Sequence, residues 1–331
     1  MTAISQSTGF GALSPDAILD ALEGIGLACD GRILALNSYE NRVYQIGIED
    51  AEPLIAKFYR PQRWTDAAII EEHQYTLALA AEEIPVVAPC LGEQGQSLYH
   101  HGAYRFALYP CRGGRAPELD DPDQLEQMGR FVARIHALGA TQAFKHRPTL
   151  DIQQFGVQAR EFLLSHDFLP EHMREAYESL SLDLIEQVKC CYQRAGTVQN
   201  IRLHGDCHPG NILWRDQVPH IVDFDDARMG PAIQDLWMFL SGDRTYMTAR
   251  LADVLEGYTQ FHEFNPAELY LVEALRTLRM IHYAAWLASR WGDPAFPLAF
   301  PWFNTVRYWE AHVLSLREQR ALLDEPPLVW G

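Results

Sequence analysis

Residues 203–214 read LHGDCHPGNILW, and residues 221–226 a little further along read IVDFDD. Each stretch sets polar side chains beside apolar residues that favour strands. Asp206 is followed five positions later by Asn211, and twelve positions after that by Asp223. A buried polar group is costly unless it is hydrogen-bonded, so a segment that only packs in a core would not concentrate polar residues in this way. The two stretches therefore predict a functional site.

Length, charge and hydropathy narrow the kind of protein. The 331 residues exceed the usual size of one hydrophobic core and predict two domains. The net charge of −17 argues against a nucleic-acid partner, because phosphate binding depends on lysine and arginine. No uncharged apolar run is long enough to span a membrane, and residues 1–11 lack the basic and apolar segments of a secretory signal. A cytoplasmic, monomeric protein that contacts no membrane is expected.

Two interpretations of residues 204–211 are weak. His204 and His208 are four apart and could bind zinc from one face of a helix, but Pro209 would break that helix. Cys207 beside His208 suggests a nucleophile and its base, yet adjacent side chains rarely face each other and nothing marks this thiol as activated. The six cysteines show no Cys-x-x-Cys spacing and are expected to be free thiols of a reducing compartment.

The third interpretation is phosphoryl transfer. In kinase catalytic loops an aspartate accepts the proton of the attacking hydroxyl, an asparagine five positions on binds Mg²⁺, and a later aspartate holds the metal that bridges the phosphates. Asp206, Asn211 and Asp223 have this order and spacing. Mg²⁺ prefers oxygen ligands, and it offsets the charge of a triphosphate. One Asp-x-x-x-x-Asn is a weak signal, so the rest of the chain has to support it.

Lys57 provides such support. It lies in a strand-like run at 54–59, where a lone lysine usually faces solvent. Glu71 and Glu72 lie in a helical stretch at 67–81, where glutamates usually form a solvated face. However, a lysine on a strand followed about fifteen residues later by a helical glutamate is the arrangement with which protein kinases hold ATP phosphates.

The order of the predicted elements indicates the fold class. Runs at 42–48 and 54–59 predict a β-hairpin, and the Gly-rich basic segment 110–115 predicts a connection between two lobes. After this segment, apolar residues recur mostly at helical spacing. We therefore expect an α+β fold, with a small antiparallel sheet and a helix in residues 1–110 and a larger, mostly helical lobe in residues 111–331 that carries the catalytic and metal-binding loops.

The central motif resembles that of a known family. HGDCHPGNILW followed by VDFD is similar to the Brenner motif and the metal-binding strand of the aminoglycoside phosphotransferase and choline kinase family, a branch of the protein-kinase-like fold. Other strings resemble a branch of serine/threonine protein kinases that act in bacterial stress responses: LNSYENRVYQ at 36–45, KFYRP at 57–61, HRPT at 146–149, QDLWM at 234–238 and DPAFP at 293–297. The resemblance covers nearly the whole chain. It implies a bilobal kinase fold, ATP and Mg²⁺ as cofactors, and a protein substrate with a serine or threonine acceptor, the enzyme itself included.

The resemblance also implies roles for individual residues. Asp206 would be the catalytic base, and Asn211 and Asp223 would be the magnesium ligands. Lys57 would contact the α and β phosphates. Glu72 would pair with Lys57, and Glu71 is the alternative because the helix register is open.

Further roles follow at the edges of the expected site. The loop from Ser38 to Arg42, with Asn41, would cover the phosphates, although it departs from protein kinases in lacking G-x-G-x-x-G. Backbone groups of Leu108 and Cys111 would meet the adenine.

Three residues would support the catalytic and metal-binding loops. His204 would brace the catalytic loop as a buried, hydrogen-bonded histidine, and Asp235 would do likewise from the element that follows. Asp225 could be a second metal contact or a polar residue at a helix start.

The acceptor stays open at this point. Small-molecule kinases that act on aminoglycosides, choline or homoserine share Asp206, Asn211 and Asp223, so these residues do not separate a protein serine from a small alcohol. The acidic charge of the chain would suit a polycationic aminoglycoside or a basic protein segment. A third alternative is a nucleotide-binding regulator without turnover.

Overall fold

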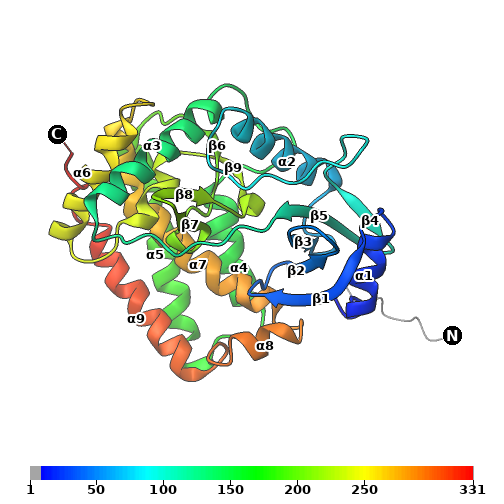
Figure 1. Ribbon diagram of the computed structural model, residues 1–331. Coiled ribbons are helices and arrows are strands. Elements are labelled where there is room, and N and C mark those ends of the chain that lie inside the picture. The colour runs from blue at the N-terminus through cyan, green and yellow to red at the C-terminus, as the bar shows by residue number, and fades with distance from the viewer. Residues whose placement is uncertain (1–8, 331) are drawn as a thin grey trace. The chain divides into compact units, whose positions relative to one another are not determined.

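The computed structural model describes residues 9–330 (Figure 1). The prediction that the chain has no secretory signal concerns residues 1–11, and residues 1–8 of that stretch lie outside the described range. Within the described range, none of the helices combines the length and the apolar character needed to span a membrane.

The chain divides into two compact units. The first comprises Met1–Ala116, Lys145–Arg147 and Gly210–Asp225, and the second comprises the remaining segments, which are Pro117–Phe144, Pro148–Pro209 and Asp226–Gly331. The first unit thus contains the whole of the predicted lobe 1–110 and adds two later segments. Asn211, Asp223 and Asp225 therefore belong to the first unit.

A sheet forms the body of the first unit. Within the described residues it has five antiparallel strands in the order β1-β2-β3-β5-β4. The elements of this unit are α1 (Pro15–Glu23), β1 (Cys29–Leu36), β2 (Arg42–Ile48), β3 (Leu54–Tyr59), α2 (Asp66–Ala81), β4 (Tyr99–His101), β5 (Tyr104–Pro110), β7 (Ile212–Arg215) and β8 (Val218–Ile221). The hairpin predicted at 42–59 is present, with Val43 opposite Lys57.

Strand β3 contributes to two cores because its side chains alternate between the faces of the sheet. Ala56 and Phe58 are buried on the face that packs on Leu22 of α1. Tyr59 is buried on the other face with Ile69 of α2. Lys57 shares this second face, and its Nζ lies 5.4 Å from the centre of the Tyr59 ring. The alternation therefore directs the Lys57 side chain toward α2 rather than toward α1.

Strands β7 and β8 form a separate hairpin. Its turn residues Asp216 and Gln217 have φ values of 51° and 62°, the left-handed conformation that tight hairpin turns require. The amide of Ile221 donates to the carbonyl of Pro85 at 2.8 Å, which fastens the hairpin to the segment after α2. The hairpin brings residue 211 next to residue 222, since the Val222 amide donates to the Asn211 carbonyl at 3.0 Å.

The second unit is mostly helical. Its helices are α3 (Pro122–Gly139), α4 (Ala159–Ser165), α5 (Glu171–Ala195), α6 (Arg244–Tyr258), α7 (Val272–Arg290), α8 (Ala295–Ala299) and α9 (Val306–Leu322). Its shorter elements are a π-helical segment (Gln153–Gln158), the paired strands β6 (Ile201–Leu203) and β9 (Arg228–Gly230), and the 3₁₀ turns η4 (Ala232–Asp235), η5 (Trp237–Phe239) and η6 (Pro266–Leu271). Two further 3₁₀ turns, η2 (Pro209–Asn211) and η3 (Phe224–Asp226), lie where the chain passes from one unit to the other.

Helices α3 and α6 approach each other at glycines. A Cβ placed on Gly129 would lie 2.0 Å from the carbonyl oxygen of Val254, and one on Gly257 would lie 1.8 Å from that of Glu126. Backbone contact at this distance excludes any side chain, so these two glycines set the spacing of the pair. Helix α3 carries His136 toward Tyr258 of α6, whose hydroxyl lies 2.9 Å from His136 Nδ1.

Candidate active site

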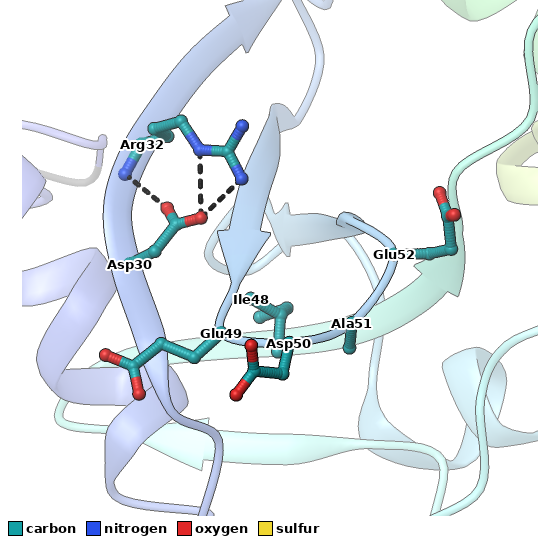
Figure 2. A pocket seen from close by; sticks show the side chains of 7 residues that line it. All are labelled: Asp30, Arg32, Ile48, Glu49, Asp50, Ala51 and Glu52. Carbon is teal, nitrogen blue, oxygen red and sulfur yellow. Dashed lines mark hydrogen bonds and ion pairs between the residues drawn. The ribbon is translucent and has the colours of Figure 1, made fainter.

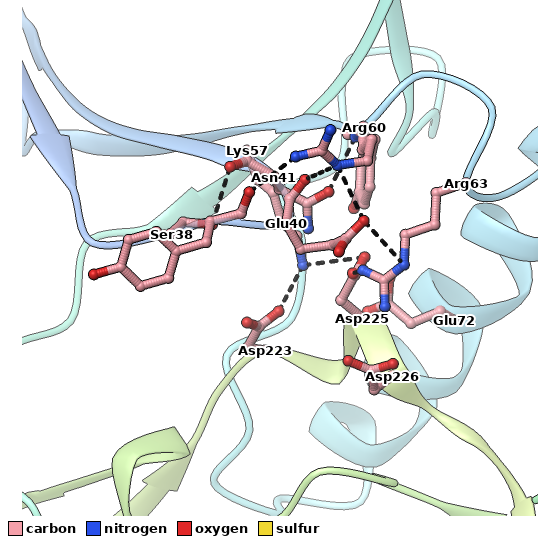
Figure 3. A network of polar contacts seen from close by, with 12 residues as sticks. Ser38, Glu40, Asn41, Lys57, Arg60, Arg63, Glu72, Asp223, Asp225 and Asp226 are labelled. Atoms are coloured by element: carbon pink, nitrogen blue, oxygen red, sulfur yellow. Dashed lines mark hydrogen bonds and ion pairs between the residues drawn. The ribbon is translucent and has the colours of Figure 1, made fainter. Parts of the chain in front are cut away.

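Lys57 lies at the centre of a charged cluster in the first unit (Figure 3). Its Nζ is 2.7 Å from Asp223 Oδ1 and 3.5 Å from Asp225 Oδ1, and its side chain is only 8% exposed. The solvent-facing position usual for a lone lysine is therefore wrong here. Burial by itself would lower the pKa of Lys57, but the two carboxylates outweigh burial and hold this pKa above its ordinary value. The lysine remains a buried cation.

The two glutamates of α2 have different environments. Glu71 accepts hydrogen bonds from the backbone amides of residues 145–147, at 2.6, 2.8 and 3.0 Å, so its carboxylate fastens that segment to the helix. Glu72 is buried on the side of Lys57, and its Oε2 has no hydrogen-bond partner. Burial raises the pKa of Glu72 to about 7, even though the positive charge of Lys57 opposes this rise.

The predicted pair between Lys57 and Glu72 is not formed as an ion pair. Within residues 9–330, Lys57 Nζ pairs with the two aspartates instead. The physical reason is that both aspartates lie within ion-pair distance of Lys57 Nζ, whereas burial raises the pKa of Glu72 and favours its neutral form. Of the two candidate glutamates, Glu71 and Glu72, it is Glu72 whose charge raises the pKa of Lys57.

The loop before β2 is held by its own polar groups. Ser38 Oγ donates to the Asn41 carbonyl at 3.3 Å. Asn41 is buried, and its Oδ1 accepts the Arg60 amide at 3.1 Å. The predicted role of the Asn41 side chain toward phosphate therefore competes with a structural one, since its oxygen ties the loop to the end of β3.

Sequence reasoning did not find a chain of charges that links this loop to Asp225. Arg60 Nε lies 3.1 Å from Glu40 Oε1, and Arg63 Nε lies 3.6 Å from the same oxygen. Arg63 Nη1 also pairs with Asp225 Oδ2 (Figure 3). The sequence signal for this chain of charges was the pair of arginines, Arg60 and Arg63, just after the strand of Lys57. Asp225 is buried among cations, so it is not a solvent-facing residue at a helix start.

Asp223 has the local geometry of a constrained functional residue. Its φ is 62°, an uncommon conformation for a residue other than glycine, and such strain concentrates at functional sites. Its side chain is 51% exposed. Asn211 lies next to residue 222 through the backbone bond described above. Their amide and carboxylate oxygens suit Mg²⁺, which typically takes one or two protein ligands and completes its shell with phosphates and water.

Asp206 belongs to the second unit, where hydrogen bonds from Asp235 and His204 hold the backbone of its loop. Asp235 accepts the amides of His204 and Gly205 at 2.7 and 2.8 Å, and its Oδ2 lies 3.1 Å from His136 Nε2. Burial would raise the pKa of Asp235, but the bond to His136 and the charges and amides around it lower this pKa overall. His204 is fully buried, and its Nδ1 accepts the Asp206 amide at 3.3 Å.

The loop also requires a glycine. Gly205 has a φ of 86°, and a Cβ at this position would lie 2.2 Å from the Asp226 carbonyl oxygen. Its own carbonyl accepts Gln234 Nε2 at 3.1 Å. The backbone on both sides of Asp206 is therefore fixed, while the Asp206 side chain itself is 24% exposed. A base that must meet a substrate needs this combination.

The two weak interpretations of this loop find no support. Cys207 is buried, and burial raises the pKa of its thiol well above the ordinary value, so it is not an activated nucleophile. His204 is fully buried and its Nδ1 is bonded to the Asp206 amide, and among the described residues no group of three or more His, Cys, Asp or Glu side chains is arranged around a metal position, so zinc finds no support here. All six cysteines are free thiols, as predicted.

The residues predicted to meet adenine lie at and after the end of β5. The Leu108 carbonyl accepts the Cys90 amide at 2.7 Å, so this group serves the unit's own structure. Cys111 follows the strand and is partly exposed. Of the two, Cys111 is the residue whose backbone is left to contact a base.

An open hollow elsewhere in the first unit does not suit a nucleotide (Figure 2). It lies at the turn between β2 and β3, and its lining residues are Asp30, Arg32, Ile48, Glu49, Asp50, Ala51 and Glu52. Four of these are acidic, and Arg32 already pairs with Asp30. Lys57 lies opposite Val43 in the strand register, near the end of the hairpin that is away from this turn. Acidic groups would repel a triphosphate here.

The fold and the motif define a class. Residues 32–272 match the phosphotransferase enzyme family, and the chain belongs to this family. The α+β protein-kinase-like fold predicted from the sequence is confirmed.

Individual relatives make the class more specific. The chain is 46% identical over 319 residues to stress response kinase A of Escherichia coli O157:H7, with 96% of each chain covered. It is 44% identical over 319 residues, again with 96% of each chain covered, to a protein of Salmonella typhimurium named serine/threonine protein kinase RdoA. Among solved structures, amicoumacin kinase hAmiN in complex with AMP-PNP, Ca²⁺ and Ami has a TM-score of 0.73 at 17% identity and covers 95% of this chain and 94% of its own.

Proposed function

We propose that this phosphotransferase is an ATP- and Mg²⁺-dependent serine/threonine protein kinase of the bacterial stress response, acting as a cytoplasmic monomer. The observation that carries the proposal is the buried Lys57 cation held 2.7 Å from Asp223 in the unit that also contains Asn211. The names of the relatives support a kinase of this kind.

The first unit would bind the nucleotide. Lys57 would contact the phosphates, and the neighbouring Asp223 and Asn211 would supply oxygen ligands to Mg²⁺. The metal, when bound, would neutralise phosphate charge that protein cations alone do not offset in a chain of net charge −17. Glu40, Arg60 and Arg63 would keep the loop of Ser38 and Asn41 in place over this group.

The second unit would bind the acceptor. Asp206 would accept the hydrogen bond of a serine or threonine hydroxyl and take its proton as the new O–P bond forms to the γ-phosphorus. The bond from the γ-phosphorus to the β–γ bridging oxygen would break in the same transfer, and ADP would leave. Asp235 and His204 would act as positioning residues, because they hold the backbone of the loop and leave the Asp206 carboxylate partly exposed. Only four residues separate Asp206 from Asn211, so one short segment would join the base and the metal ligand.

A small-molecule kinase is the second candidate. The observation in its favour is the fold shared with amicoumacin kinase hAmiN, whose complex contains AMP-PNP and the compound Ami. Asp206, Asn211 and Asp223 would have the same roles in either case, so the acceptor alone distinguishes the two candidates.

The test is phosphate transfer from radiolabelled Mg-ATP by the purified protein. One generic acidic protein, one generic basic protein, an amino sugar and choline would be offered separately, and labelled serine and threonine would be identified after hydrolysis. Labelling of protein that is lost in Asp206→Ala supports the proposal. Turnover only with the amino sugar or choline would favour the second candidate, and Mg-dependent ATP binding without any turnover would favour a regulator.

A further inference from the structure

Arg279 is a cation beside Asp206 that neither the sequence motif nor the proposed roles explain. It lies on α7, 73 residues after Asp206, and its Nη1 is 2.5 Å from Asp206 Oδ1. The Arg279 side chain is 42% exposed. His208 Nε2 lies 3.6 Å from the other carboxylate oxygen and is 38% exposed. The exposed carboxylate of Asp206 is thus bordered by two basic side chains.

Most of the hydrogen-bonding capacity of Arg279 is still available. A guanidinium has five N–H donors in a rigid planar fork. Within residues 9–330, one of these donors is used, in the bond to Asp206. The remaining donors can engage a carboxylate or a phosphate in a bidentate fashion without breaking the bond to Asp206.

A second arginine near the Asp206 loop is already engaged. Arg228 is almost fully buried and is already paired with Asp226. A positively charged acceptor would therefore meet Arg279 at the carboxylate it needs, whereas a negatively charged one would meet unused donors.

We propose that Arg279 determines acceptor specificity, selecting hydroxyl acceptors that carry an anionic group beside the hydroxyl and disfavouring cationic acceptors. This inference rests on the proposed function and names its substrate class. The anionic group could belong to glutamate or aspartate residues next to a serine, or to the carboxylate of a small hydroxy acid. The overall acidity of the chain would suggest the opposite preference, so the local charge at Asp206 is what the inference depends on.

Two simpler roles for Arg279 make different predictions. If it only orients Asp206, or if it only contacts the γ-phosphate, its loss would lower phosphate transfer to every acceptor by the same factor. Specificity toward the acceptor would instead change the ratio of rates between acceptors.

The experiment compares matched acceptors. Two six-residue peptides with one central serine, one flanked by glutamates and one by lysines, would be assayed for kcat/KM alongside glycerate and choline. The proteins would be the full-length wild type, Arg279→Gln, Arg279→Lys and the control Arg317→Gln. Arg317 is an exposed residue of α9 with the same charge, so its substitution controls for net charge.

The wild type and Arg317→Gln are expected to prefer the glutamate-flanked peptide over the lysine-flanked one by about tenfold, and glycerate over choline if the natural acceptor is small. Arg279→Gln is expected to bring the peptide ratio close to one, and Arg279→Lys to keep its direction. A ratio that is unchanged in Arg279→Gln, or a wild type that prefers the lysine-flanked peptide and choline, overturns the inference while the kinase activity stands. If the wild type binds Mg-ATP but labels none of the four probes or the generic proteins, the proposed function fails and the inference fails with it.

Discussion

Aspartates in both units bind cations or imidazoles, but the surroundings of these aspartates differ. In the first unit Asp223 is half exposed, and its carboxylate is held by an ion pair to Lys57. Within residues 9–330, no backbone amide donates to this carboxylate. In the second unit Asp235 is fully buried and accepts two backbone amides as well as contacting His136. A half-exposed carboxylate held by one cation can exchange partners by breaking a single ion pair, whereas a buried network loses several bonds at once. The first arrangement suits ligands that come and go, and the second suits a loop that must stay still.

The largest expected effect is on stability, in the second unit. Asp235→Asn would keep one oxygen and set its N–H₂ group against the amide of either His204 or Gly205, and it would leave His136 without a charged partner. We expect the free energy of unfolding to fall by about 3 kcal/mol, as when one partner of a buried pair is removed. Urea unfolding would measure it. Asp183→Asn, at an exposed pair with Arg320, is the control and should change stability by less than about 1 kcal/mol. A small, equal effect for both variants would mean that the loop is not held as described.

The next effect is on nucleotide binding, in the first unit. Lys57→Met would remove the buried cation from between Asp223 and Asp225 and leave their negative charges facing the phosphates. We expect the Kd for Mg-ATP to rise about 100-fold by calorimetry, since charge-assisted contacts to phosphate are strong. Lys189→Met, at an exposed pair on α5, should leave the Kd unchanged. Unaltered binding in Lys57→Met would remove this lysine from the site.

A smaller effect concerns the pH dependence of stability. Glu268 accepts the Ile233 amide at 2.9 Å, and burial raises its pKa to about 7 even though backbone amides of η4 lower it. A carboxyl whose pKa is raised by folding contributes stability below its unfolded pKa, and this contribution is lost as pH rises through about 7. Glu268→Gln should therefore flatten the decline in unfolding free energy between pH 5 and pH 8 by about 2 kcal/mol relative to the wild type.

The control for this pH experiment is Glu318→Gln, an exposed position on α9. Urea titrations at several pH values would give the slopes. Parallel pH curves for the wild type and Glu268→Gln would contradict the raised pKa. The lowered pKa of Asp235 has the opposite sign, because its contribution is lost as pH falls.

The smallest expected effect is in the loop before β2. Glu40→Gln would weaken its ion pairs with Arg60 and Arg63 while the backbone bonds of the loop remain. Because the change removes charge and not the contacts, we expect KM for ATP to rise about threefold with kcat little altered. Steady-state kinetics would measure it. A large loss of kcat would instead give Glu40 a part in the chemistry.

Some of the site could be predicted because it depends on spacing along a single stretch. Asp206, Asn211 and Asp223 belong to one loop and the hairpin after it, so their order in the sequence carries the information. The strand position of Lys57 was also predictable, since alternating side chains mark a hairpin. Its burial was not, because only the packing of α2 on the second face of the sheet decides that.

Other features depend on residues far apart in the chain. Glu71 and Glu72 are neighbours with the same chemistry, and what separates them is the backbone of residues 145–147, more than seventy positions later. Arg279 meets Asp206 only because α7 packs near the loop, and nothing in the local sequence of α7 marks this. Such contacts are a property of the folded chain, so a motif search does not find them.

In the proposed function the two units have different tasks, since Asp223 would bind metal and nucleotide and Asp206 would act on the acceptor. The direct measurement pairs Asp206→Asn with Asp223→Asn, each examined for Mg-ATP affinity by calorimetry and for phosphate transfer in a single turnover. We expect Asp206→Asn to keep the affinity within roughly twofold and to slow transfer about 1,000-fold, and Asp223→Asn to lose both. Transfer that survives Asp206→Asn, or Mg-dependent ATP binding that survives Asp223→Asn, would contradict the claim.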